Sequence, residues 1–218
     1  MSPQSIPNLL GFFRIIATPL LVVFILADNP VGYWAAAILL LLMAISDIVD
    51  GKLARKLQVV SPLGIFLDTT SDKIFVAGAL IPMVERGLIP GWVALIIILR
   101  DFIISGLRSF AAAEGHIIAA REWGKQKLTI TVTALVWCLI DAGVNGAAAP
   151  LFGITTDTLP LPIMLFARLA SLWPVPMALA LIWTVGSGAE YIWQAWPLLM
   201  HDTPKKPAEP PPQKSSVK

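Results

Sequence analysis

The sequence predicts an all-α, polytopic integral membrane protein with six transmembrane helices and a polar cavity that faces the cytoplasm. Hydrophobic residues make up 56% of the 218 residues, and the mean hydropathy is +0.76. This is too apolar for a soluble domain of this size. The apolar residues also fall into six runs, each near the about 20 residues that cross a bilayer core. Four aspartates lie between the strongly apolar run that ends at Ser46 and the one that begins at Ile74.

The six predicted spans cover residues 9–27, 31–46, 63–84, 92–113, 127–145 and 169–188. The first could instead be a secretory signal, because an apolar stretch follows one positive charge at Arg14. However, residues 1–13 carry no Lys or Arg, and Ala27-Asp28-Asn29-Pro30 is a poor cleavage site. We therefore expect a retained first span in which Pro19 is a tolerated kink.

Lysine and arginine in the connecting segments predict the orientation. With a cytoplasmic N-terminus, the outer connections at 28–30, 85–91 and 146–168 carry only Arg86 and Arg168. The inner connections at 47–62 and 114–126 and the tail carry many more, namely Lys52, Arg55, Lys56, Arg121, Lys125, Lys205, Lys206, Lys214 and Lys218. This asymmetry predicts that the aspartates face the cytoplasm, where nucleotides are available.

The chain reads as one membrane domain, residues 1–202, followed by a tail at 203–218. The tail is rich in proline and poor in apolar residues, so we expect it to be disordered. The net charge is only +2, and no basic arm indicates nucleic-acid binding. Cys138, the one cysteine, lies in an apolar run and favours packing over redox chemistry.

The aspartates come in two pairs at helical spacing. Asp47 and Asp50 are three residues apart, and Asp68 and Asp72 are four apart, so each pair shares one helix face. Pro62 and Gly64 lie between the pairs and predict a helical hairpin that brings the two faces together. Four carboxylates so close together require a cation, and ligation by oxygen atoms alone favours Mg²⁺ or Mn²⁺. Two such ions would offset the four charges.

Small and basic residues follow the first pair. Gly51 and Ala54 allow a ligand to approach the helix backbone, and the Arg55 guanidinium can fork onto phosphate oxygens. The whole pattern, Asp47-x2-Asp50-Gly51-x2-Ala54-Arg55-x8-Gly64-x3-Asp68-x3-Asp72, resembles the complete signature of the CDP-alcohol phosphotransferases at all eight specified positions. Eight identities at fixed offsets are far more specific than a short motif.

The resemblance implies roles for these residues. Asp47, Asp50, Asp68 and Asp72 would hold two divalent ions at the donor pyrophosphate, and Asp72 would also be the general base for the acceptor hydroxyl. The residues implied at CDP-diacylglycerol are Gly51, Ala54, Arg55, Ser61 and Asn8. Asn8 belongs to an opening, residues 6–10 with Arg14 after it, that is similar to the branch using glycerol 3-phosphate as acceptor.

The fourth predicted span carries a second charged group, Arg100, Asp101 and Arg108. One interpretation is an intramembrane salt bridge with a snorkelling Arg108. The other is substrate binding, which the resemblance favours: Arg100-Asp101, Ser105, Leu107-Arg108 and Gly124-Lys125-x-Lys127 are similar to the glycerol 3-phosphate branch. A phosphorylated acceptor needs its own cations, and the residues implied for it are Arg108, Arg121, Lys125 and Lys127.

The expected activity is therefore transfer of the phosphatidyl group from CDP-diacylglycerol to sn-glycerol 3-phosphate in a bacterial inner membrane, giving phosphatidylglycerophosphate and CMP. The resemblance also implies a homodimer. The aspartate motif leaves other acceptors open: inositol phosphate, serine or another phosphatidyl group. From other classes, a cation transporter could use intramembrane acids, but it needs no Arg55 beside its cation site. A structural scaffold offers no reason for four interfacial aspartates.

Overall fold

The computed structural model contains seven α-helices and no strand within the residues it describes, 5–57, 62–114, 122–145 and 161–200. Of these, residues 5–8, 50–57, 62–63, 65–66, 68, 122–125, 163 and 197–199 are described by their backbone alone. The helices are α1 (Ser5–Leu26), α2 (Pro30–Leu57), α3 (Pro62–Glu85), α4 (Gly91–Ala113), α5 (Glu122–Asn145), α6 (Leu161–Ala170) and α7 (Pro174–Met200).

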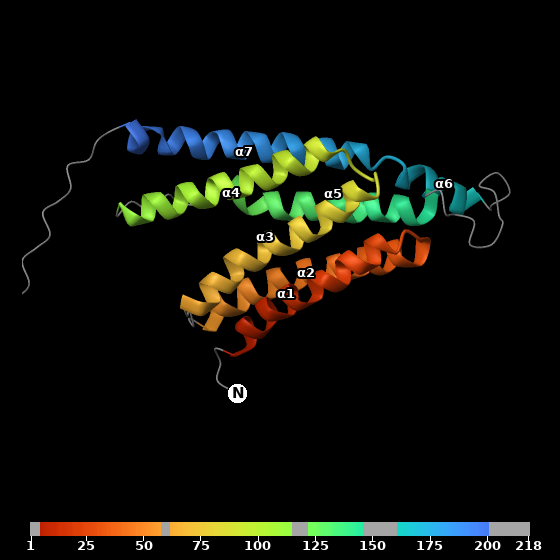
Figure 1. Cartoon of the computed structure of the whole chain (residues 1–218), viewed down its shortest axis with the longest axis horizontal. Coiled ribbons are helices and arrows are strands. Elements are labelled where there is room, and N and C mark those ends of the chain that lie inside the picture. Colours follow the sequence, from red (N-terminus) through yellow and green to blue (C-terminus); the bar gives the residue numbers. More distant parts are fainter. Residues whose placement is uncertain (1–4, 58–61, 115–121, 146–160, 201–218) are drawn as a thin grey trace, which may run out of the picture.

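The helices pack as two layers (Figure 1). α1 lies against both α2 and α3, and α7 lies against both α4 and α5. The main contact between the layers is α2 on α5, with a smaller one between α3 and α4. The start of α1, the end of α2, the start of α3 and the ends of α4 and α7 all lie toward the left of the view in Figure 1. The predicted aspartates come from the end of α2 and the first half of α3, and Arg100 and Asp101 from the middle of α4.

The predicted all-α membrane fold is confirmed. Apart from α6, every helix has between 22 and 28 residues, enough at about 1.5 Å per residue to cross a core of about 30 Å. Four stretches of the described chain are also apolar enough to span a membrane: Leu9–Leu26, Pro30–Val49, Gln126–Asn145 and Met164–Trp196. α3 and α4 carry charged residues near their middles, so the count of six spans stays a prediction.

Two predicted spans differ in extent from the helices that carry them. The second span was expected to end at Ser46, near the end of the apolar stretch Pro30–Val49, and α2 continues beyond it to Leu57, so Asp47 and Asp50 lie on an unbroken helix. Residues 46–57 contain no proline, and Leu, Ala, Lys and Arg in this segment favour helix continuation. The last span was expected to begin at residue 169, but α6 and α7 are separate helices. Pro174 opens α7 because its fixed φ suits the first helical position.

The hairpin between the aspartate pairs differs in detail. Pro62 is the first residue of α3, as expected of a residue that cannot continue a preceding helix. Gly64 lies inside α3 and does not break it. A clearer glycine stop occurs after α3: Gly87 has φ +69°, and Leu88 N–H donates to the Met83 carbonyl at 2.9 Å. This is a Schellman ending, which turns the chain sharply into α4.

Each core-facing stripe is apolar along most of its length and charged at one end. On α2 the buried positions Tyr33, Ala36, Leu40 and Met43 lead at the same helical spacing to Asp47. On α1 the stripe runs from buried Ile25 and Leu21 through Thr18 to Arg14, and on α5 from Cys138 and Leu135 through Thr131 to Lys127. Residues three and four apart share a face, so the charged groups point into the bundle.

Candidate active site

α2 and α3 bring their aspartates to the same region. Asp47 has an exposed side-chain fraction of 15%, and Asp72 of 34%. Both reach the same group, since the Arg14 Nη1 atom forms an ion pair with Asp47 Oδ1 and lies 3.5 Å from Asp72 Oδ1. The backbone places Asp50 one turn beyond Asp47, and Asp68 one turn before Asp72.

This arrangement suits a divalent cation. Carboxylate oxygens from two helices converge on one positive centre, Arg14, and carboxylates are the ligands that Mg²⁺ and Mn²⁺ prefer. Asp47 and Asp72 are the two members of the predicted ligand set with described side chains. No cluster of three or more His, Cys, Asp or Glu that could hold a metal forms among the side chains described.

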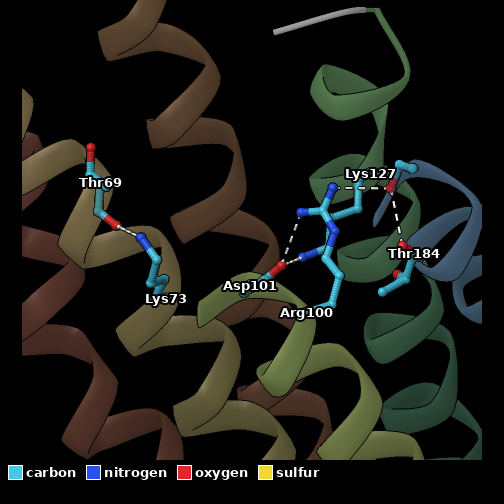
Figure 2. Close-up of polar contacts among 7 residues, drawn as sticks. Thr69, Lys73, Arg100, Asp101, Lys127 and Thr184 are labelled. Atoms are coloured by element: carbon cyan, nitrogen blue, oxygen red, sulfur yellow. Dashed lines mark hydrogen bonds and ion pairs between the residues drawn. The ribbon is translucent and has the colours of Figure 1, made fainter. Parts of the chain in front are cut away.

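A second charged cluster joins α4, α5 and α7 (Figure 2). Asp101 of α4 forms ion pairs with Lys127 of α5 and with its own neighbour Arg100, whose Nη1 lies 3.2 Å from Asp101 Oδ1. All three side chains are largely buried, with exposed fractions of 16% for Asp101, 7% for Lys127 and 14% for Arg100. Two cations share one anion here, so the cluster has a surplus positive charge.

Residues of α7 also contact the Arg100 side chain. Arg100 Nη2 donates to Ser187 Oγ at 3.0 Å, and Ser187 Oγ donates to the Thr184 carbonyl at 3.2 Å (Figure 2). The guanidinium also lies over the Tyr191 ring, 5.9 Å from its centroid, within the range of a cation–π contact. Arg100 Nε is buried and has no hydrogen-bond partner among the described residues.

The two clusters lie on neighbouring helices. Helix α3, which carries Asp72, contacts both α4, which carries Arg100 and Asp101, and α5, which carries Lys127. Lys73, the residue after Asp72, points to its own helix, where its Nζ donates to the Thr69 carbonyl at 2.8 Å (Figure 2). The site thus has acidic groups on α2 and α3 facing a cationic group on α4 and α5.

The other predicted residues are distributed as follows. Arg108 is exposed on α4, two turns beyond Arg100. Asn8, Gly51, Ala54, Arg55 and Lys125 lie on described helix backbone, in α1, α2 and α5, but their side chains are outside the description. Ser61 and Arg121 lie outside the described residues. Lys127 is therefore the one predicted acceptor-site residue that the described structure brings into the buried cluster.

Two functional features were missed by the sequence analysis. Arg14 was considered only as the charge of a possible signal and as part of the N-terminal resemblance, although it is fully buried at the aspartates. Its signal was available: Gly11, Arg14, Thr18 and Leu21 follow core spacing on an apolar helix, and an ionisable residue at such a position is usually functional. The contact of Arg100 with Ser187 had no comparable signal, because it joins residues 87 apart.

Comparison with known proteins assigns the family. The model of the CDP-alcohol phosphatidyltransferase family matches residues 4–173. The chain belongs to this family. The matched segment contains the complete aspartate signature and both charged clusters except the α7 residues Thr184, Ser187 and Tyr191. The enzyme is therefore a CDP-alcohol phosphatidyltransferase with its charged groups on the helices that the family model covers.

Three relatives of this phosphatidyltransferase carry the name CDP-diacylglycerol–glycerol-3-phosphate 3-phosphatidyltransferase. The Bacillus subtilis protein is 33% identical over 207 residues, covering 89% of this chain and 97% of its own. The Rickettsia bellii protein is 30% identical over 132 residues, 61% of this chain and 73% of its own. The Cereibacter sphaeroides protein is 32% identical over 145 residues, 65% and 66% of the respective chains.

Solved structures show the same fold. The Mycobacterium tuberculosis phosphatidylinositol phosphate synthase with CDP-DAG bound has a TM-score of 0.54 at 20% identity, with 91% of each chain covered. The same synthase in complex with manganese and citrate has a TM-score of 0.52 at 22% identity, covering 91% of this chain and 87% of the other. At these identities the likeness extends to the fold of this phosphatidyltransferase and no further.

Proposed function

We propose that this enzyme transfers the phosphatidyl group from CDP-diacylglycerol to sn-glycerol 3-phosphate, giving phosphatidylglycerophosphate and CMP. The observation that carries the proposal is the pairing of a carboxylate site, Asp47 with Asp72, with a buried cation, Lys127, on a helix that contacts α3. The relatives named above favour this acceptor. A phosphorylated acceptor also needs a cation close to the acidic site, and serine does not.

On this proposal the aspartates hold the divalent metal. Asp47, Asp50, Asp68 and Asp72 would bind two Mg²⁺ or Mn²⁺ ions, and the manganese complex of the solved synthase supports a metal of this class. The bound ions would supply positive charge to the donor pyrophosphate and the departing phosphate oxygen. Gly51, Ala54, Arg55, Ser61 and Asn8 would contact the CDP portion, as the family signature implies.

The chain's own groups would then move one proton and orient two phosphates. Asp72 accepts the proton of the acceptor hydroxyl. That oxygen attacks the donor phosphorus that carries diacylglycerol, the bond from this phosphorus to the CMP oxygen breaks, and CMP leaves with the electron pair. Lys127, with Arg108, Arg121 and Lys125, would bind the acceptor phosphate. Asp101 and Arg100 would keep the Lys127 ammonium in place.

The proposal includes the surroundings of the site. Positive residues between the predicted spans support a cytoplasm-facing site in a bacterial inner membrane. One membrane domain, residues 1–202, would carry the activity, and the tail at 203–218 would remain outside it. The homodimer stays a prediction from the family resemblance.

CMP release by the purified protein in detergent tests the proposal. CDP-diacylglycerol and Mg²⁺ or Mn²⁺ are supplied with glycerol 3-phosphate, inositol phosphate or serine in parallel reactions. We expect release with glycerol 3-phosphate alone, and a loss of about 10²-fold or more for Asp72→Asn, since a general base typically contributes that much. Asp68→Asn should also abolish release.

Each other outcome would correct a different part of the proposal. Release with inositol phosphate would keep the reaction and change the acceptor. If a thermal unfolding transition shows that the protein is folded, absence of CMP release with every acceptor would overturn phosphatidyl transfer. Flux of divalent ions into proteoliposomes without CMP formation would instead support a cation transporter.

A further inference from the structure

Arg14 occupies a core position of an apolar transmembrane helix. Its side chain is fully buried, and Gly11, Thr18, Leu21 and Ile25 on the same α1 face are buried too. An arginine at such a place is costly unless it meets fixed partners, because the guanidinium never loses its charge. The residues around Arg14 must therefore supply partners for its charge.

Small residues press this face of α1 onto α3. A Cβ on Gly11 would lie 3.2 Å from the Leu67 Cβ, and a Cβ on Gly78 would collide with Thr18 Cγ2. These two close approaches lie on either side of Arg14 along α1. They fix the distance between the helices, so the guanidinium is held where α2 and α3 present their carboxylates.

Two proposed metal ligands are among the partners of Arg14. Its Nη1 atom forms ion pairs with Asp47 from α2 and with Asp72 from α3, the latter at 3.5 Å. One cation from α1 thus joins carboxylates from two other helices. A divalent ion at this site would bind the same two carboxylates.

We infer that Arg14 is a positioning residue, the built-in counter-cation of the metal site: it holds the carboxylates of Asp47 and Asp72 together before a divalent ion binds, and it competes with that ion for them. The inference rests on the proposed function in one respect, that Asp47 and Asp72 are metal ligands. It goes beyond that function because Arg14 would set the metal affinity and the stability of the metal-free enzyme.

Thermal unfolding and Mn²⁺ binding of the full chain in detergent test this inference. In EDTA, Arg14→Met should lower the Tm by about 5 °C or more, because two carboxylates lose their shared cation. Saturating Mn²⁺ should reverse most of the decrease in Tm. The Kd for Mn²⁺, measured from the free-ion electron paramagnetic resonance signal, should fall by about threefold or more, since a nearby positive charge is gone.

Two further variants separate this role from packing. Arg86→Met is the matched control, because Arg86 pairs with Asp28 at 3.6 Å at the other end of α3, and its effect on the Tm should be the same in EDTA and in Mn²⁺. Arg14→Lys keeps the positive charge but loses the planar guanidinium that can contact two carboxylates at once. Its Tm in EDTA should lie between those of the wild type and Arg14→Met, with the Kd for Mn²⁺ near the wild-type value.

The contrary results are distinct. Equal Tm losses for Arg14→Met in EDTA and Mn²⁺, or an unchanged or raised Kd, would overturn the inference. If Arg14→Met does not fold, Arg14→Lys decides: a Tm in EDTA no lower than that of the wild type overturns it. A wild-type protein that binds no Mn²⁺ would refute the metal site itself, and CMP release would report the proposed function separately.

Discussion

Asp101 shows how one residue can organise a cationic site inside a membrane protein. It accepts from Lys127 on α5 and from Arg100 on α4, and Arg100 in turn reaches Ser187 on α7. A carboxylate shared by two cations keeps both charged in a buried place at a lower cost than either would have alone. The sequence left two alternatives for this group, an intramembrane salt bridge and substrate binding. The buried cluster contains the salt bridge, and its surplus positive charge suits an anionic substrate as well.

Asp101→Asn separates these two roles. The variant leaves Lys127 without its anionic partner, so we expect kcat/KM for the acceptor to fall by about tenfold or more, or about 1.4 kcal/mol. The KM for CDP-diacylglycerol should remain within about twofold, because the donor is bound elsewhere. Steady-state CMP release with each substrate varied in turn provides the measurement.

The control for this variant is on α5. Asp141→Asn removes a carboxylate that accepts from Asn145 at 2.8 Å, far along the helix from Lys127, and should leave the acceptor kcat/KM unchanged. If Asp101→Asn lowers the Tm but not the acceptor kcat/KM, the cluster is a structural ion network only.

At the scale of helices, glycine decides how close α1 and α3 lie. Gly78 faces Thr18, and Thr18 Oγ1 donates to the Arg14 carbonyl at 2.8 Å. Small residues at a transmembrane helix interface allow this close packing, which replaces the hydrophobic driving force that lipid does not supply. The position of Arg14 at the aspartates therefore depends on a helix contact formed by residues with almost no side chain.

Gly78→Ala should weaken this contact. The new methyl group must displace the Thr18 side chain, which costs about 1–2 kcal/mol and lowers the Tm in detergent by about 2–6 °C. Gly106→Ala and Gly186→Ala are matched controls, since a Cβ at either site meets nothing within 4 Å. Both should be neutral or slightly stabilising, because alanine favours a helix over glycine. Equal losses in all three variants would refute the close-contact explanation.

At the scale of the whole molecule, the alternating helices gather the charged ends of the stripes. Asp47 lies toward the end of α2, Asp72 in the first half of α3, and Lys127 near the start of α5. Successive antiparallel spans return the chain to one membrane side, so residues far apart in sequence can share a site. The positively charged connections predict that this side is the cytoplasmic one.

Labelling of introduced cysteines tests the orientation. In a Cys138→Ala background, which removes the one native cysteine, Glu85→Cys and Glu114→Cys place thiols at exposed positions, at the last residue of α3 and directly after α4. A membrane-impermeant maleimide should label Glu85→Cys in intact spheroplasts and Glu114→Cys only in inverted vesicles. The reverse pattern would place the aspartates on the outer side and contradict the proposed access to cytoplasmic nucleotide.

The sequence by itself determined the membrane class, the helical nature of the chain and the family. These depend on local properties: composition, runs of apolar residues and the fixed offsets from Asp47 to Asp72. The spacing also predicted correctly that the members of each aspartate pair lie about one turn apart on a helix. The predicted spans stop short of the end of α2 and cross the break between α6 and α7, because apolarity marks a membrane segment and not where a helix ends.

Only the tertiary structure decided which charges meet. Arg14 pairs with Asp72, 58 residues away, and Arg100 with Ser187, 87 residues away. Hydropathy could not predict these contacts, because the helix faces exposed at the surface are as apolar as the core: Ile16, Leu41 and Leu95 are exposed, while Leu21, Leu40 and Ile97 are fully buried. In a membrane protein the rotation of each helix is set by close packing and by buried polar partners, and these exist only once the helices have assembled.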